Sequence, residues 1–353
     1  MSQGVFPGGV LLIAVGPETA GLVCAGRIET GTQSRPVTPE TIYDLASLTK
    51  ILSTTILTMI FLEEGYFSLE TPLVRLWPGP VPQDKKSLTL GQLLGHISGL
   101  PAWRPYYQDL AKVPAGKRRA RAAELILKEP LESEPGRREV YSDLNFILLG
   151  LILEEAGQAR QDILFNRLIA GPLGLKSIGY RPLDSGSLPL PENLAPTEKV
   201  PGRGGLLRGA VHDDNAAALA GVAGHAGLFG PVREAWFIFN SLRAAHQNEP
   251  GPRLVSPEIV RAFWRKPGAS PHRARVLGFD TPSPAGSSAG RFFSPRSVGH
   301  LGFTGVSLWH DPGKDLTIIL LTNRVHPAAS NEAIRKFRPH IHDIVAESLD
   351  PQT

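Results

Sequence analysis

Short apolar runs near both ends of the chain predict β-strands. Residues 9–15 and 21–25 are two such runs with a Gly-Pro pair between them, which is typical of two strands joined by a tight turn. Near the other end, residues 305–310 and 316–322 flank the turn sequence Asp-Pro-Gly-Lys at 311–314 and predict a hairpin. We expect strands from both chain ends to pair into one antiparallel sheet.

The middle of the chain is patterned for helices instead. Residues 51–62 are apolar around most of a helix circumference but too few to cross a bilayer, so they predict a buried central helix. Residues 180–209 are rich in Pro, Gly and Ser and predict a long loop. Further helical patterns occupy residues 89–94, 120–128, 141–150, 162–169, 231–245 and 331–348, the last with Pro339 as a bend.

Together these elements predict an α/β fold of the α+β type. We expect an antiparallel sheet built from both chain termini and flanked by helices, plus a mainly helical insert, with a cleft between them. On this interpretation, residues 1–64 and 231–353 form the sheet domain. Residues 65–230 form the helical insert domain, which carries long cleft-lining loops.

The composition is that of a globular protein, with 42% hydrophobic and 20% charged residues among 353. The formal net charge of +4 is mildly basic, and the largest basic cluster, residues 117–121, has no aromatic residues among its charges. We interpret this cluster as a solvated helix face and expect no nucleic-acid partner.

Cysteine usage and the first residues bear on the cellular compartment. Cys24 is the single cysteine, so no intrachain disulfide can form. The N-terminal residues lack the charged region and the small-residue cleavage site of a signal peptide. We therefore expect a cytoplasmic protein with no membrane partner.

Ser47 and Lys50 are the first candidates for chemistry. Three residues apart on a helix, their side chains lie on one face, one turn apart. A neutral lysine can take the proton of a serine and make it a nucleophile, but this requires a lysine pKa lowered by about 3 units. The apolar residues 51–62 supply burial, and the helix N-terminus favours developing negative charge. The pattern Ser-x-x-Lys at residues 47–50 is also typical of a helix start with a surface lysine. The rest of the sequence has to distinguish a catalytic pair from such a helix start.

Four short segments occur in an order that resembles the class C β-lactamase-related serine hydrolases. They are Ser47-Leu-Thr-Lys50, Leu94-Gly-His-Ile-Ser-Gly-Leu-Pro101, Tyr141-Ser-Asp143 and His300-Leu-Gly302. This superfamily includes class C β-lactamases, D-alanyl-D-alanine peptidases, family VIII-type esterases and related amidases. The resemblance extends from about residue 6 to the C-terminus and implies an acyl-enzyme mechanism without a cofactor.

The resemblance also implies a role for each matching residue. Ser47 is the acylated nucleophile, and Lys50 is its activating partner. Tyr141 takes part in acid/base work, with Lys50 and His300 as its cationic neighbours. The backbone N–H groups of Ser47 and Phe303 form the oxyanion hole.

This chain departs from the family pattern at two positions that matter chemically. Asp143 stands where the family's Tyr-x-Asn motif has asparagine, and His300-Leu-Gly302 replaces Lys-Thr-Gly. Leucine has no hydroxyl, and histidine is only partly cationic at pH 7, so recognition of a substrate carboxylate is weakened. We therefore expect a small ester or amide as substrate, muramyl-peptide fragments included, in preference to β-lactams.

Three alternatives remain open at this point. The chain is a β-lactamase or D-Ala-D-Ala carboxypeptidase, it transfers acyl groups to an alcohol or amine, or it is a non-catalytic ligand-sensing protein on the same fold. A sensor has no need of Ser47, Lys50 and Tyr141 together, which favours an enzyme.

Several further residues are candidate substrate contacts. Asp143 and Gly302 belong to the motifs above, and the glycine-rich segment around His225 is expected to line the cleft. Trp103 is a candidate pocket wall, and Arg324 a candidate contact for an anionic substrate, although a solvated surface arginine is the competing interpretation. His212, Asp213, Asp214 and His225 lack regular metal-ligand spacing, so we expect no metal.

Overall fold

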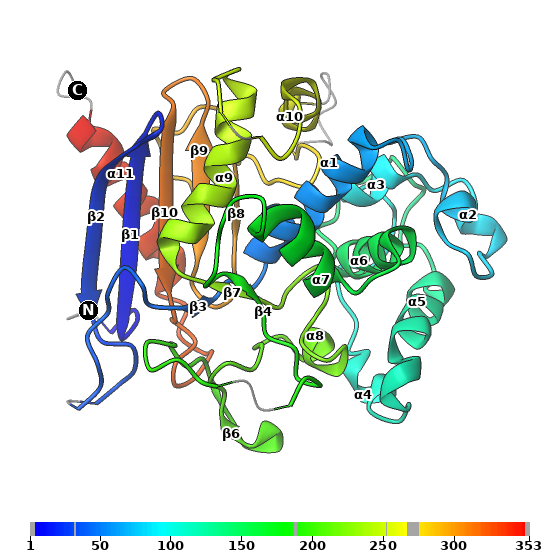
Figure 1. Ribbon diagram of the computed structural model, residues 1–353, viewed down its shortest axis with the longest axis horizontal. Helices are drawn as coiled ribbons and strands as arrows, with labels where there is room; N and C mark the ends of the chain where they lie inside the picture. Colours follow the sequence, from blue (N-terminus) through cyan, green and yellow to red (C-terminus); the bar gives the residue numbers. More distant parts are fainter. Residues whose placement is uncertain (1–3, 32, 187–188, 252, 267–274, 350–353) are drawn as a thin grey trace.

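The computed structural model describes residues 4–31, 33–186, 189–251, 253–266 and 275–349. Its main sheet has five antiparallel strands in the order β2-β1-β10-β9-β8. The strands are β1 (Gly8–Val15), β2 (Glu18–Gly26), β8 (Val298–Leu301), β9 (Ser307–Asp311) and β10 (Leu316–Thr322). Because β1 pairs directly with β10, strands from the two chain ends share one sheet, as predicted (Figure 1).

One helix covers each face of this sheet (Figure 1). α9 (Val232–His246) packs against β1 and β10, and α11 (Ile334–Leu349) lies on the opposite face. Alternate residues of β1 serve the two layers: Leu12 belongs to the main core with α9, and Leu11 to a second apolar cluster with α11. The central strands are therefore buried on both faces, whereas the edge strand β2 is partly exposed.

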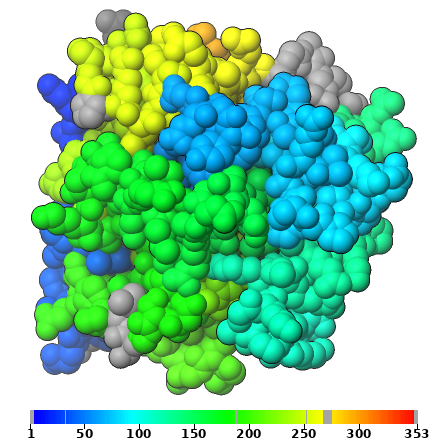
Figure 2. Space-filling view, turned by 45° about the vertical axis from the view of Figure 1, so that its right-hand side comes forward, coloured from blue at the N-terminus to red at the C-terminus, as the bar shows by residue number. Residues whose placement is uncertain are grey.

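The helices of the middle of the chain lie beside the sheet. Lys50–Thr54 forms a π-helical stretch that leads directly into α1 (Thr55–Glu63), whose residues are almost all buried. The other helices are α2 (Leu73–Leu76), α3 (Leu90–Leu94), α4 (Tyr107–Leu110), α5 (Arg118–Lys128), α6 (Asp143–Gly157), α7 (Gln161–Phe165), α8 (Asp214–Ala218) and α10 (Pro257–Trp264). Figure 2 shows the face where blue, cyan and green segments of this part of the chain cover the surface, next to the yellow segments around α10.

Short strands connect the helical part to the sheet part. β3 (Tyr43–Asp44), β7 (Leu228–Gly230) and β4 (Gly179–Tyr180) form a small sheet in the order β3-β7-β4. β5 (Lys199–Val200) and β6 (Gly205–Leu206) form a separate pair. The small sheet places the segment before Ser47 beside the glycine-rich segment that contains His225.

The α/β fold class is confirmed, and most predicted elements are present. The predicted helix at 89–94 is α3, where Thr89 and Gln92 form a reciprocal capping box. Strand β8 and helix α10 were not predicted; β8 contains Gly299 and the buried His300, which interrupt an apolar pattern. The division into domains 1–64 with 231–353 and 65–230 stays a prediction. Among the described residues, no helix has both the length and the apolar character needed to cross a bilayer.

Candidate active site

A strained turn presents Ser47 at the start of the central helix. The chain leaves β3 at Asp44, and Ala46 adopts a φ of 45°, in the left-handed region that residues with a Cβ rarely occupy. The carboxylate of Asp44 accepts the Ala46 N–H at 2.8 Å and so supports this turn. Strain of this kind costs about 1–3 kcal/mol and persists at sites where a side chain must be presented in one orientation.

Two side chains converge on the Ser47 hydroxyl, Lys50 from one helical turn away and Tyr141 from 94 residues along the chain. Lys50 Nζ donates to Ser47 Oγ at 2.9 Å, and the Tyr141 hydroxyl donates to the same oxygen at 3.1 Å. The ammonium of Lys50 is fully buried, lies 2.7 Å from Asp143 Oδ1, and donates to the carbonyl of His225 at 3.1 Å. The predicted group Ser47, Lys50, Tyr141 and Asp143 is therefore assembled in space.

The charges around Lys50 decide its protonation. Burial by itself would lower the pKa of Lys50, but Asp143 and Tyr141 outweigh burial and raise it above its ordinary value. Burial raises the pKa of Tyr141 to about 12, although the charge of Lys50 opposes this. The resting pair is an ammonium beside a neutral phenol. The lowered pKa that a neutral Lys50 requires is not found, because Asp143 places a carboxylate 2.7 Å from the amine.

His300 lies next to Tyr141, with 5.6 Å between the ring centroids. Burial lowers the pKa of His300, so the ring is neutral at pH 7. It is therefore not the cationic neighbour of Tyr141 that the resemblance to the serine hydrolases implied. Its Nδ1 is 2.7 Å from the carbonyl oxygen of Leu301. This contact assigns the proton to Nδ1, because a carbonyl oxygen only accepts. In the described part of the chain, His300 Nε2 has no hydrogen-bond partner, so a buried acceptor remains free beside the cleft.

The loop between β8 and β9 lies directly against the Ser47 turn. A Cβ atom on Gly302 would come within 2.3 Å of a Val306 methyl group and 3.0 Å of the Leu45 carbonyl oxygen, so glycine is required there. The Thr304 hydroxyl ties the loop to the carbonyl oxygen of Asp44 at 2.8 Å. Within the ranges that the structure describes, no hydrogen bond engages the backbone N–H of Ser47 or of Phe303. Both predicted oxyanion donors are thus free.

Two pockets flank Ser47, and Asp143 and Phe303 line both of them. The first, of about 350 Å³, we name the acidic pocket; it is also lined by Trp103, His212, Asp213, Asp214 and His225. The second, of about 500 Å³, we name the basic pocket; it is also lined by Arg275, His300, Arg324, Arg335 and Arg338. All five residues predicted to contact substrate therefore line one of two cavities that meet at the serine.

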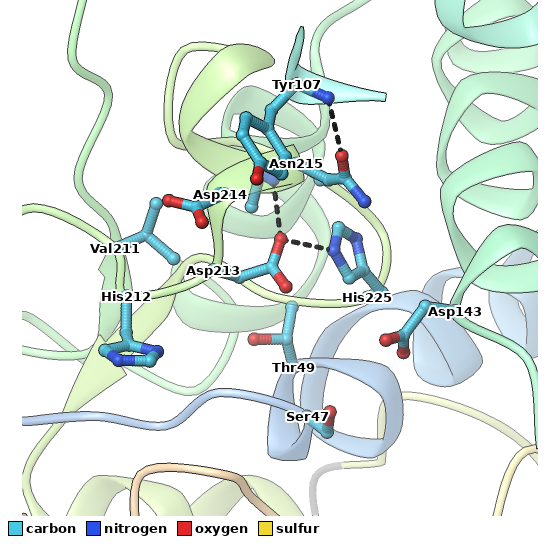
Figure 3. A network of polar contacts seen from close by, with 12 residues as sticks. Ser47, Thr49, Tyr107, Asp143, Val211, His212, Asp213, Asp214, Asn215 and His225 are labelled. Carbon is cyan, nitrogen blue, oxygen red and sulfur yellow. Dashed lines mark hydrogen bonds and ion pairs between the residues drawn. The ribbon is translucent and has the colours of Figure 1, made fainter. Parts of the chain in front are cut away.

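Side-chain pairs organise the acidic pocket (Figure 3). Asp213 accepts from His225 Nε2 at 2.8 Å and caps α8 through the Ala216 N–H at 2.7 Å. Burial would raise the pKa of Asp213, but His225 and the cap outweigh burial and lower it. His212 pairs separately with Glu198 at 2.8 Å. Among the described residues, no three His, Cys, Asp or Glu side chains are grouped to hold a metal ion.

Arginines dominate the basic pocket. Arg275 pairs with Glu139 at 2.6 Å and with Asp280 at 2.5 Å, and its guanidinium lies 5.6 Å from the centroid of the Tyr141 ring. Arg324 is 7% exposed, so it is not a solvated surface residue. It donates to the Phe303 carbonyl oxygen at 2.8 Å and lies 4.4 Å from the centroid of the Phe303 ring.

Several groups in these pockets were not identified from the sequence. Arg275 and Asp280 lie in a stretch without a recognisable motif, and Arg275 meets Glu139 across 136 residues of chain. The pairing of Asp213 with His225 spans twelve residues that include a short helix and a glycine-rich turn. No spacing rule predicts such contacts, because they depend on how loops fold back.

Comparison with known proteins places this geometry in a family. The family described as Beta-lactamase matches residues 1–341. A protein of Salmonella paratyphi A, named provisionally as a D-alanyl-D-alanine carboxypeptidase, is 31% identical over 325 residues, covering 84% of this chain and 72% of that protein. A relative with the same name in Salmonella typhimurium has the same identity and coverage.

Solved structures share the fold at lower identity. EstCE1, a hydrolase with promiscuous acyltransferase activity, has a TM-score of 0.73 at 21% identity, covering 98% of this chain and 95% of its own. The octameric penicillin-binding protein homologue from Pyrococcus abyssi has a TM-score of 0.72 at 19% identity, covering 98% of this chain and 76% of its own. With the family match over nearly the whole length and the relatives at 31% identity, the chain belongs to the beta-lactamase family and is a serine hydrolase of the β-lactamase-related superfamily.

Proposed function

We propose that this serine hydrolase acts on small esters or amides through an acyl-enzyme on Ser47. The observation that carries the proposal is that Ser47 Oγ lies 2.9 Å from Lys50 Nζ and 3.1 Å from the Tyr141 hydroxyl, in a cleft with two free backbone N–H groups. Attack of Ser47 Oγ on the substrate carbonyl would place the oxyanion on the N–H groups of Ser47 and Phe303. The leaving alcohol or amine takes a proton as it departs, and water then hydrolyses the acyl-serine.

The proton of Ser47 has two acceptors within reach, Lys50 and Tyr141. Since Lys50 rests as an ammonium and Tyr141 as a phenol, neither accepts a proton at rest. We propose that the pair first loses one proton to solvent, then accepts the Ser47 proton during attack and returns it to the leaving alcohol or amine. Asp143 sets the pH at which the pair becomes basic, because its charge raises the pKa of both members. In this role Asp143 acts on the catalytic pair as well as facing substrate.

Recognition of a neutral group is favoured beside the free His300 Nε2. A neutral imidazole with its proton on Nδ1 offers only an acceptor at Nε2, and a substrate carboxylate also only accepts. An amide N–H or a hydroxyl is the complementary partner, and since Nε2 is closed to solvent at rest, the ring or its neighbours must move before a substrate group can reach it. This supports ester and amide substrates over β-lactams, and Trp103, His225 and Gly302 line or border the space that such a substrate would fill.

A peptide ending in D-alanine is the second candidate substrate. It is supported by the name of the Salmonella relatives and by the arginines of the basic pocket. Four arginines line that pocket with three acidic residues, Asp143, Asp280 and Glu332, so an anionic leaving group is tolerated there. The location in the cytoplasm stays a prediction.

Covalent labelling tests the proposed nucleophile. The full chain is incubated with a fluorophosphonate, and its intact mass is measured for the wild type and for Ser47→Ala. We expect one adduct on the wild type and none on the variant, with hydrolysis of p-nitrophenyl esters lost in parallel. Ser53→Ala is a matched control, since Ser53 is buried in the next turn and contacts Gln161 and Tyr180. Absence of labelling in folded wild-type protein would overturn the proposal and favour a ligand sensor.

A further inference from the structure

Arg338 of α11 is a buried cation without a carboxylate partner. It is 7% exposed, and its Nη2 donates to the backbone carbonyl oxygens of Gly302 at 2.7 Å and Val306 at 2.8 Å. Among the described residues, no acidic side chain lies within ion-pair distance of it, and burial lowers its pKa to about 10. Arg243, which is fully buried, instead pairs with Glu249 and Asp315. A cation that is desolvated without a counter-charge is costly to keep, which calls for a reason in function.

The position of the Gly302 carbonyl, which accepts the hydrogen bond from Arg338, supplies that reason. The C=O of Gly302 and the N–H of Phe303 belong to one peptide unit, and in a planar trans peptide these two groups point in opposite directions. Arg338 and the Gly305 N–H, at 3.1 Å, both bond the carbonyl side. The N–H side is then turned away from them and is free of any partner within the described residues. Gly302 itself lies against Leu45 and Ala46, next to the nucleophile.

We propose that Arg338 is a positioning residue of the oxyanion hole, which holds the Gly302–Phe303 peptide with its N–H facing Ser47. This inference rests on the proposed function, because it gives Phe303 N–H a task in acyl transfer. A hydrogen bond from a cation to the carbonyl also polarises the peptide, so the N–H becomes a stronger donor for the developing oxyanion. Gly302 has no side chain that would hinder rotation of the following peptide. The hydrogen bond from the Arg338 guanidinium holds the orientation of that peptide instead.

Arg324 acts on the other side of the same residue. It donates to the Phe303 carbonyl oxygen at 2.8 Å and is anchored by the Ala329 and Asn331 carbonyl oxygens at 2.7 and 3.0 Å. Two buried guanidinium groups therefore bond the consecutive carbonyls of Gly302 and Phe303. The orientation of the intervening N–H is determined from both ends.

The test compares an ester with its thiono analogue, in which sulfur replaces the carbonyl oxygen and binds poorly in an oxyanion hole. Arg338→Met and Arg338→Lys are made in the full chain, and kcat and KM are measured with neutral p-nitrophenyl esters. We expect kcat of the Met variant to fall about 10- to 100-fold for the ester while KM stays within about twofold, since loss of one oxyanion donor costs 10²–10³ in kcat. The ester-to-thionoester ratio should fall in the same variant. The Lys variant, which keeps a charged donor, should recover part of both.

A matched control separates this role from stability. Arg243→Met removes another buried guanidinium, one that lines neither pocket, and should lower the melting temperature without changing the ester-to-thionoester ratio. Infrared spectra of the acyl-enzyme give a second measurement: the ester carbonyl stretch should move to higher frequency in Arg338→Lys, because the oxyanion hole polarises it less.

Two results would overturn the inference. One is a folded Arg338→Met variant with unchanged kcat and ratio. The other is a loss confined to KM for substrates that bear a carboxylate, which would make Arg338 an anion-binding residue of the basic pocket. Both leave fluorophosphonate labelling of Ser47 intact, whereas failure of the proposed function removes the labelling itself.

Discussion

The two pockets beside Ser47 are held together in different ways. In the acidic pocket, polar side chains pair with one another, as Asp213 does with His225 at 2.8 Å. In the basic pocket, the buried Arg324 and Arg338 donate hydrogen bonds to backbone carbonyls of the loop that carries Phe303. The first arrangement holds side chains that can contact a substrate, and the second immobilises a peptide unit. Changes in the acidic pocket should therefore alter substrate preference, and changes in the basic pocket should alter turnover.

The largest effect is expected at the point where the pockets meet. Lys50→Met removes the ammonium that contacts Ser47 and Asp143, and kcat/KM for every ester should fall by about 10³-fold, as for loss of an acid/base group. Because Lys50 contacts Ser47, which lines both pockets, the loss should be the same for acyl groups of different charge when the leaving group is kept constant. Lys85→Met is the control: Lys85 is also buried and paired, with Asp84, but in the described part of the chain it contacts neither Ser47 nor Asp143. A loss that depends strongly on the charge of the acyl group would contradict a shared centre.

A smaller effect, on pH dependence, is expected for Asp143→Asn. The charge of Asp143 raises the pKa of Lys50 and of Tyr141, so removing it lowers both. Activity requires the deprotonated base and rises with pH through that pKa. The acidic limb of the kcat/KM profile should therefore move to lower pH in the variant, by about one unit or more.

The profile is measured with a neutral ester, so that the charge of the substrate does not contribute. Asp311→Asn provides the control, since this buried carboxylate at the end of β9 accepts from the backbone N–H and the hydroxyl of Ser294 and lines neither pocket. A profile that stays in place, or moves to higher pH, would show that Asp143 does not set the basicity of the pair.

The smallest effect is expected from Asp213→Asn. Asparagine can still cap α8, so the loop should keep its shape while the pocket loses one negative charge. The kcat/KM for an ester with an amine on its acyl group, relative to a neutral ester, should fall about fivefold, which corresponds to a partly screened charge contact of about 1 kcal/mol. Asp214→Asn should change it less, because that carboxylate is 45% exposed and pairs with Arg203. Equal effects of both variants on all esters would remove the distinction between the pockets.

Local patterns predicted the elements whose partners are close in sequence. The capping residues of α3 are three positions apart, and the β9–β10 hairpin closes over a four-residue turn. The predicted helix at 141–150 exists as α6 but continues to Gly157, because the apolar residues after position 150 are also buried. Ser47 and Lys50 needed only helical spacing to be brought together.

Long-range contacts account for what the sequence left unpredicted. The Lys50 amine meets the carbonyl of His225 across 175 residues, and Arg338 reaches Gly302 from another element. Arg324 lies just after strand β10, a position that is compatible with either an exposed or a buried side chain. Packing against the Phe303 loop buries it.

The sequence by itself determined the strand pair at each end, the helix behind Ser47 and the candidates for catalysis, because periodicity, caps and motifs act within a few residues. Only the tertiary structure decided that Asp143 raises the pKa of Lys50 and that, among the described residues, no hydrogen bond engages the Phe303 N–H. Protonation depends on how far a buried amine lies from a carboxylate elsewhere in the chain, and the direction of a peptide depends on what bonds its carbonyl. Both depend on distances between residues that are far apart in the sequence, and a local sequence pattern does not predict such distances.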